Sequence, residues 1–140
     1  MLSTLIIYRP VLVLLVILFI SDGRSVPDTQ VGGTWDAHFV GKVRGTGSSQ
    51  TDTFVMDLKQ DGSRVKGTIV FKGLNVAIPV TGKVTGTTLS YTGKASIGPK
   101  CEAEVVGETT VDDAAGRIEG SQTQSNCEGT AIGKVTAVRR

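Results

Sequence analysis

Two hydrophobic patterns divide this chain. An unbroken apolar run covers residues 11–20, after Arg9 and before a short polar segment. From Thr34 onward, apolar residues instead alternate with polar ones at a period of two, and glycine interrupts the alternation at short intervals. A period of two is typical of half-buried β-strands. No helical stripe of ten residues follows residue 25, so the pattern predicts an all-β domain.

The apolar run has the layout of a secretory signal. The marks of such a signal are a basic residue, an apolar core of about 7–15 residues and a small-residue exit. Cleavage after Gly23 or after Ser25 would suit that exit. The alternative is an uncleaved membrane anchor, but Arg9 and Pro10 interrupt the run, and a spanning helix needs about 20 apolar residues.

These patterns predict the organisation of the whole chain. We expect residues 1–23 to be a signal peptide, or an N-terminal anchor if cleavage does not occur. Residues 24–33 would then be a flexible arm, and residues 34–140 the folded domain. The mature protein would be secreted or periplasmic, and would contact a membrane only if its N-terminal segment remained uncleaved.

Short turns predict which residues face each other. A two-residue hairpin loop fixes the register of the strands on either side of it. Loops at 61–62, 73–74 and 86–87 keep one apolar face through four successive strands. The predicted pairs on that face include Leu58 with Val65, Phe54 with Ile69, Ile69 with Ile78, Val84 with Leu89 and Gly82 with Tyr91, and the outer face pairs Asp57 with Lys66. A glycine opposite Tyr91 would let the aromatic ring lie over bare backbone.

The remaining strands complete a meander. A first strand at 34–44 has Trp35, Ala37 and Phe39 on one face, and the last two strands cover 117–126 and 130–138. Eight sequential antiparallel strands leave two free edges, and pairing the last strand with the first removes both. We therefore predict an antiparallel up-and-down meander of about eight strands, closed as a barrel.

One predicted strand, 117–127, has no apolar face. If Ile118 points inward, the even-numbered polar residues of the strand point inward too. If Cys101 lies opposite Cys127, the odd-numbered residues point inward instead, and a bulge would be needed to satisfy both requirements. In either register this strand presents polar side chains to the interior.

The cysteines and the charges add two further expectations. In an exported chain, Cys101 and Cys127 favour a disulfide over free thiols or a metal site, and the bridge would contribute about 3–4 kcal/mol. Residues 37–100 carry nine lysines or arginines and three aspartates, whereas residues 101–128 carry one arginine and seven acids. This asymmetry is typical either of a partner surface or of oppositely charged strands that solvate each other.

The sequence contains no convincing catalytic, metal-binding or nucleic-acid-binding motif. Asp36 and His38 share a strand face that is external if Trp35 is internal. The acids from Glu102 to Glu108 likewise alternate with inward residues. Because the aromatic residues of the mature chain are expected inside, the surface lysines lack stacking partners for nucleic acid. We expect no catalytic residue, no metal and no cofactor, and therefore no enzyme.

The start of the domain resembles that of known barrel families. Gly33-Thr34-Trp35, followed by a meander that contains GSRVKGT at 62–68, is similar to avidin-like and lipocalin-like barrels and to exported bacterial eight-stranded barrels with a Gly-Thr-Trp start. The resemblance implies that Trp35 packs across one end of the barrel. It does not imply biotin binding, because residues 36–39 differ from the biotin-contacting segment of avidin and Trp35 is the sole tryptophan.

Two functional hypotheses follow from this architecture. An eight-stranded barrel is filled by side chains or holds one small ligand. The first hypothesis is a non-enzymatic exported barrel that binds a small amphipathic ligand through Trp35, Tyr91, Gln122 and Gln124. The alternative is a protein-interaction module, similar to a protease inhibitor or an envelope structural protein, that acts through its surface or its N-terminal arm.

Overall fold

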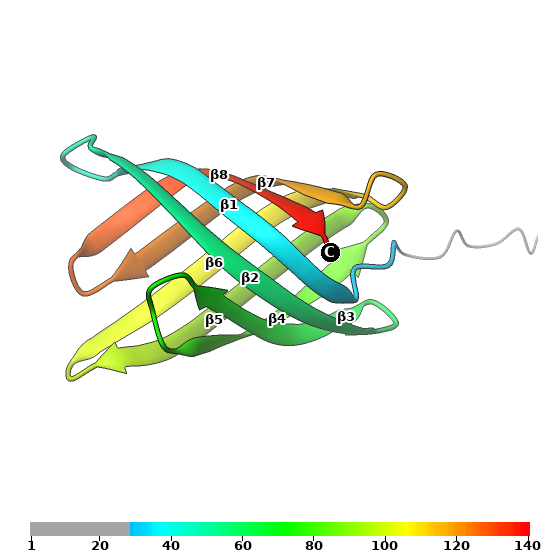
Figure 1. The fold of residues 1–140 in the computed structure, drawn as a ribbon, viewed down its shortest axis with the longest axis horizontal. Helices are drawn as coiled ribbons and strands as arrows, with labels where there is room; N and C mark the ends of the chain where they lie inside the picture. Colours follow the sequence, from blue (N-terminus) through cyan, green and yellow to red (C-terminus); the bar gives the residue numbers. More distant parts are fainter. Residues whose placement is uncertain (1–28) are drawn as a thin grey trace, which may run out of the picture.

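The chain forms a closed eight-stranded antiparallel barrel, which confirms the predicted meander and its closure (Figure 1). The computed structural model describes residues 29–140, so the predicted signal peptide lies outside the described residues. Within that range no helix is long and apolar enough to cross a membrane. The strands are β1 (Gly33–Val43), β2 (Ser49–Asp61), β3 (Arg64–Phe71), β4 (Ala77–Thr85), β5 (Thr88–Gly98), β6 (Cys101–Asp112), β7 (Arg117–Asn126) and β8 (Gly129–Arg139).

The registers of β3, β4 and β5 are those predicted from the turns. Ile69 pairs with Ile78 across β3 and β4, and Gly82 pairs with Tyr91 across β4 and β5. These pairs follow from loops that place a positive-φ glycine at Gly73 and Gly86. A local turn signal was therefore sufficient to set the register of two hairpins.

The predicted register of β2 and β3 is wrong by two residues. The loop is 62–63 rather than 61–62, with Gly62 at φ 64°, so Leu58 faces Gly67 instead of Val65. A shift of two keeps the same residues inside, and it brings Phe54 opposite Phe71 with their ring centroids 4.9 Å apart. On the outer face, Asp57 and Lys66, which were predicted to pair, face Thr68 and Lys59 respectively. The aromatic pair favours this register over the predicted charge pair.

The ambiguity in β7 is resolved in favour of Ile118. Ile118 and Gln122 are fully enclosed, so the even-numbered residues of β7 point inward. Cys127 lies in the two-residue turn between Asn126 and Gly129, beyond the end of the strand. The disulfide therefore imposes no parity on β7, and the predicted Cys101–Cys127 bridge forms with a Cα–Cα distance of 5.1 Å.

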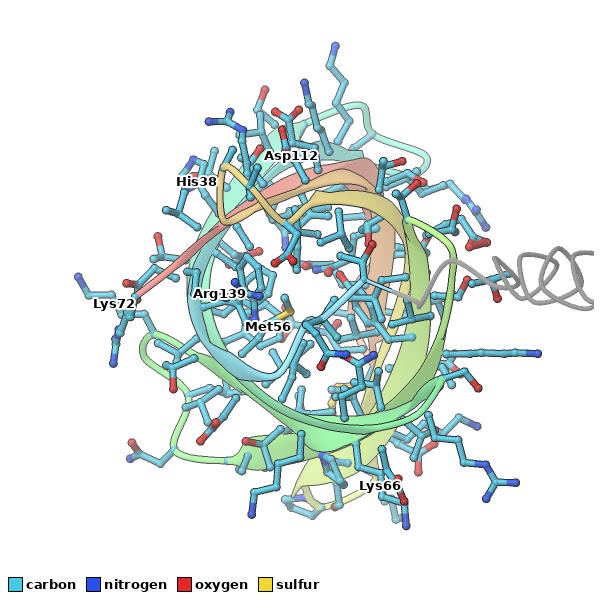
Figure 2. All side chains as sticks on the ribbon, turned by 90° about the vertical axis from the view of Figure 1, so that its right-hand side faces the viewer. His38, Met56, Lys66, Lys72, Asp112 and Arg139 are labelled. Carbon is cyan, nitrogen blue, oxygen red and sulfur yellow. A yellow bond between two sulfur atoms is a disulfide. The ribbon has the colours of Figure 1, made fainter. Side chains whose placement is uncertain are left out.

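Most of the barrel interior is a packed apolar core. Figure 2 shows Met56 inside the ring of strands and His38 and Lys66 outside it. The alternation of buried and exposed residues along each strand produces this division. The largest fully buried side chains are Trp35, Phe39, Phe54, Met56, Ile69, Ile78, Leu89 and Ile118, together with Gln122.

A short segment and an arginine close one end of the barrel. The Trp35 ring lies there with no exposed surface, and its indole N–H donates to the Val31 carbonyl at 2.9 Å. The guanidinium of Arg139 lies over the ring, 4.6 Å from the centroid. Gln60 anchors the segment by accepting a hydrogen bond from the Val31 N–H at 2.6 Å and donating to the Thr29 carbonyl at 3.0 Å. We call this end, which carries the turns at 62–63, 86–87 and 113–116, the closed end.

Part of the segment expected to be a flexible arm belongs to this closure. Residues 29–32 pack against the barrel, and Val31 is fully enclosed. Arg139 adds a further contact by donating from Nη2 to the Gln30 carbonyl at 2.7 Å. Residues 24–28 of the expected arm lie outside the described residues.

Candidate functional site

A cavity of about 310 Å³ lies at the opposite end of the barrel, which we call the open end. The turns at 44–48, 72–76, 99–100 and 127–128 surround it. Strands β3 and β4 are the shortest of the eight, and their connection stops short of the neighbouring turns (Figure 1). The barrel wall is therefore lowest at β3 and β4, beside the cavity.

One side of the cavity is apolar. Inward-pointing residues of four adjacent strands, β3 to β6, contribute to it. This apolar wall consists of Phe71, Ile78, Ile97, Ala103 and Val105. Ile78, Ala103 and Val105 are buried, whereas Phe71 and Ile97 are partly exposed at the rim. The apolar wall thus continues the core up to the mouth of the barrel.

The other side of the cavity carries polar groups, with the apolar Val43 of β1 and Ala131 of β8 between them. Gln50 and Asp52 come from β2 and Gln124 comes from β7, and we call these three residues the polar wall. Asp52 Oδ2 accepts hydrogen bonds from the Gln50 amide at 2.9 Å and from the Gln124 amide at 2.5 Å. Because the two amides belong to strands separated by β8 and β1, these bonds join opposite flanks of the barrel.

The polar wall continues into the core as a chain of hydrogen bonds. Gln122 donates from Nε2 to Gln124 Oε1 at 2.9 Å, and Tyr91 donates from its hydroxyl to Gln122 Oε1 at 2.5 Å. Burial raises the pKa of the Tyr91 phenol, so this group remains a neutral donor. Each donor in this chain of hydrogen bonds, from the Tyr91 hydroxyl through the amides of Gln122 and Gln124, points toward Asp52.

Glycines make these long-range contacts possible. One row of paired residues runs from β5 to β2, in the order Tyr91, Gly107, Gln122, Gly133, Gly41 and Gln50. A Cβ on Gly107 would overlap the Tyr91 ring, and one on Gly133 would overlap the Val40 carbonyl oxygen. Because three of the six residues in the row are glycines, the side chains on either side can reach across them.

The role of Tyr91 differs in one respect from the prediction. Its backbone pairs with Gly82 as expected, but the ring lies over Gly107 on the other neighbouring strand. This direction places the hydroxyl beside Gln122 on β7. The glycine that accommodates the ring is therefore the one between Tyr91 and its hydrogen-bond partner.

The structure separates the four predicted ligand-binding residues. Gln124 lines the cavity, while Tyr91 and Gln122 are buried below it and connect to it through hydrogen bonds. Trp35 lies at the closed end and does not border the cavity.

Sequence reasoning missed two residues of the polar wall, Gln50 and Asp52. A signal for them was present, because they continue the inward series of Phe54, Met56 and Leu58 toward the start of β2. The period-two alternation extends beyond the apolar residues of that strand, and applying it would have placed both side chains inside.

The other candidates for chemistry lie on the surface. Asp36 and His38 are exposed, as predicted, and the Arg140 guanidinium binds the Asp36 carboxylate at 2.9 Å from Nη2. This contact holds the pKa of Asp36 below its usual value. Among residues 29–140, no group of three side chains could hold a metal ion.

No protein-family model and no curated protein matches the chain. Among solved structures, the chain is similar to a protein of unknown function from the DUF3598 family of Nostoc punctiforme, with 14% identity and a TM-score of 0.48. The alignment covers 82% of this chain and 51% of the other, so the chain spans about half the length of that protein. A likeness at this level says nothing about activity.

Proposed function

We propose that this protein is an exported, non-enzymatic barrel that binds one small amphipathic molecule in its open end. The observation that carries the proposal is the division of the cavity into an apolar wall and a polar wall. Small-molecule sites are typically concave and mostly apolar, with a few polar groups that fix the orientation of the ligand. The volume of about 310 Å³ lies at the lower end of the range for such sites.

The arrangement of the two ends supports the same role. Trp35, Arg139 and the segment 29–32 fill the closed end, so a ligand would enter from the open end. At the open end the polar groups are held in place by hydrogen bonds to one another. Preorganised polar groups lose little conformational entropy when a ligand binds, which favours recognition of one orientation.

The disulfide supports the exported location. Cys101 and Cys127 join the turns at 99–100 and 127–128, next to the cavity. Disulfides of this kind form and persist in oxidising compartments such as the periplasm or the extracellular space.

Native mass spectrometry of the gently purified mature protein tests this function. We expect an additional mass that disappears on denaturation. Replacing Ala103 with phenylalanine should abolish it, because Ala103 points into the cavity and the larger ring would occupy the ligand volume. Ala114→Phe is the matched control, since Ala114 is exposed in the turn at the closed end and its replacement should leave binding intact.

A second measurement tests the cavity even if the natural ligand is lost during purification. Titration of the protein with 1-octanol should shift the NMR signals of residues lining the cavity and leave those at the closed end unchanged. A protein that carries no additional mass and shows no such shifts would contradict the proposed function and favour a role for the outer surface.

A further inference from the structure

We propose that the ligand carries a cationic head group, in the simplest case a protonated amine, and that the Asp52 carboxylate is its acceptor. This inference rests on the proposed function, because it assigns the chemical class of the molecule bound in the open-end cavity. Five features of the described residues support it: the hydrogen bonds of Asp52, its uncompensated charge, the charges around the cavity, the direction of the hydrogen-bond chain and the position of the apolar wall.

The hydrogen bonds of Asp52 leave one of its oxygens available. Both amides, from Gln50 and Gln124, donate to Oδ2. Oδ1 receives no hydrogen bond from any residue between 29 and 140. A fully buried polar atom in that state occurs at Arg139, but Asp52 Oδ1 is not buried in this way. Oδ1 is therefore accessible, and Asp52 borders the cavity. An accessible carboxylate oxygen in a cavity is an acceptor for a ligand that donates hydrogen bonds.

No residue between 29 and 140 compensates the charge of Asp52. The two amides that hold the carboxylate are neutral, and no lysine or arginine of the described chain forms an ion pair with it. Lys72 also borders the cavity, but Figure 2 shows its side chain pointing away from the barrel. A partly buried charge without a counter-charge raises the free energy of the folded protein. A cation bound beside Asp52 would therefore gain more binding free energy than it would at an exposed carboxylate.

Acidic side chains outnumber basic ones in the lining of the cavity. Glu104 and Glu128 border it together with Asp52, whereas Lys72 is the single basic residue of its lining. Lys94 lies 3.8 Å from Glu104 and partly offsets that acid. A recess whose lining has an excess of one sign of charge, with low-dielectric walls, concentrates ions of the opposite sign. The excess of acids in the lining favours a cation beside Asp52, although the turns at the open end also carry the exposed Arg44 and Lys100.

The direction of the hydrogen-bond chain reinforces this preference. Tyr91, Gln122 and Gln124 each donate toward Asp52, which fixes the orientation of both amide groups. Donors that converge on one carboxylate hold it rigidly at the cavity surface. A rigid acceptor binds an ammonium group through a charge-assisted hydrogen bond, which is stronger than one between neutral groups.

The apolar wall indicates the chemistry of the rest of the ligand. Ile78 and Val105 are buried at the inner part of the cavity, and Phe71 lies at its rim on the low side of the barrel. An alkyl or aryl group bound to these side chains would leave the head group on the side of β2 and β7. The expected ligand is thus a small amine with one compact apolar group.

Three probes that share one tail test the head group. We would measure the binding of octylammonium, 1-octanol and octanoate at pH 7 by calorimetry and by NMR titration. Octylammonium should bind at least about ten-fold more tightly than 1-octanol, since either head group can donate a hydrogen bond to the Asp52 carboxylate but only the ammonium adds the attraction of an opposite charge. Octanoate should bind more weakly than 1-octanol.

Asp52→Asn tests the residue. This change keeps the size of the side chain and removes its charge, so the advantage of octylammonium over 1-octanol should disappear while 1-octanol binding remains. Asp57→Asn is the matched control, because Asp57 is exposed on the outer face of the same strand and carries the same charge. Its replacement should leave the preference unchanged.

The outcomes separate this inference from the proposed function. Equal binding of octylammonium and 1-octanol by the unaltered protein, or tightest binding of octanoate, would overturn the cationic head group and leave the binding cavity standing. A preference that survives Asp52→Asn would overturn the assignment to Asp52. Failure of all three probes to bind would overturn both proposals. If Asp52→Asn does not fold, the ranking of the probes on the unaltered protein still decides the question of the head group.

Discussion

At the scale of single residues, glycines decide which polar groups can meet in this barrel. The Tyr91 ring crosses Gly107 to reach Gln122, and Gln124 reaches Asp52 across a flank where β8 and β1 present Gly133 and Gly41. Each glycine removes a side chain that would otherwise separate the partners. The chemistry of the polar wall therefore depends on residues that carry no chemical group of their own.

Replacing Gly107 with alanine should be strongly destabilising. The new methyl group would overlap the Tyr91 ring, so the ring must move and its hydrogen bond to Gln122 must break. We expect the free energy of unfolding to fall by about 2–4 kcal/mol, as for an overpacked core with a lost buried hydrogen bond. Urea denaturation measures this. Gly98→Ala is the control, since a methyl group there meets nothing within 4 Å. Equal stabilities of the two variants would contradict the explanation.

At the scale of elements, the two ends of the barrel are built differently. At the closed end, the start of β1, the end of β8 and residues 29–32 are held together by Trp35, Arg139 and Val31. At the open end, the short strands β3 and β4 leave the wall low, and no equivalent segment among residues 29–140 covers the cavity. The barrel is therefore closed at one end and open at the other.

Removing Arg139 should loosen the closed end without opening the barrel. Arg139→Ala deletes the stacking on Trp35 and the hydrogen bond to the Gln30 carbonyl, and should cost about 1–3 kcal/mol of unfolding free energy. Since Trp35 is the sole tryptophan, its fluorescence reports on this site alone, and we expect a red shift and faster quenching by acrylamide.

Arg140→Ala supplies the control for that experiment. Arg140 is the neighbouring arginine and binds Asp36 on the outer surface, away from the tryptophan ring. Its replacement should leave the emission of Trp35 unchanged. If both variants shifted the emission equally, the specific role of Arg139 in covering Trp35 would be wrong.

At the scale of the whole molecule, the disulfide secures the open end. The ladder between β6 and β7 ends at the pair Glu104 and Ser125, and the bridge from Cys101 to Cys127 continues the connection beyond it. The bond links residues 26 apart in the sequence, and thus restricts the unfolded chain as well as the cavity rim.

Loss of the disulfide should lower the stability of the whole barrel. A variant with both cysteines replaced by serine should lose about 3–4 kcal/mol of unfolding free energy, the entropic value for a loop of this size. Urea denaturation of the variant and of the reduced protein should give the same midpoint, below that of the oxidised protein. An unchanged midpoint would show that the native contacts of the turns alone hold the open end.

The surface charges of the barrel are also distributed unevenly among its strands. Lys59 lies opposite Lys66, and Arg64 lies opposite Lys83, so β2, β3 and β4 share a basic outer surface. Opposite charges meet between Lys94 and Glu104, where β5 adjoins the acidic β6. Opposite charges also face each other at Asp61 and Arg64, where β2 adjoins β3.

The sequence by itself determined the faces of the strands. Period-two alternation placed Trp35, Phe39 and Tyr91 inside and His38 outside, and the structure agrees for each. The alternation is robust because a strand that shifted by one residue would expose its whole apolar face to water. The same reasoning predicted a polar inner face for β7 but left open which set of residues forms it, and the structure selects the set that contains Gln122.

Only the tertiary structure decided which residues share a level of the barrel. A shift of two residues keeps the faces intact, which is why the register of β2 and β3 could not be read from alternation. The contact between Gln124 and Asp52 spans 72 residues of sequence and depends on the stagger of all the strands around the closed barrel. Which face of a strand a residue occupies follows from local burial, whereas which residues share a level follows from how the strands are staggered in the closed barrel. The sequence therefore indicated polar side chains inside the barrel, and the fold placed the Asp52 carboxylate among them.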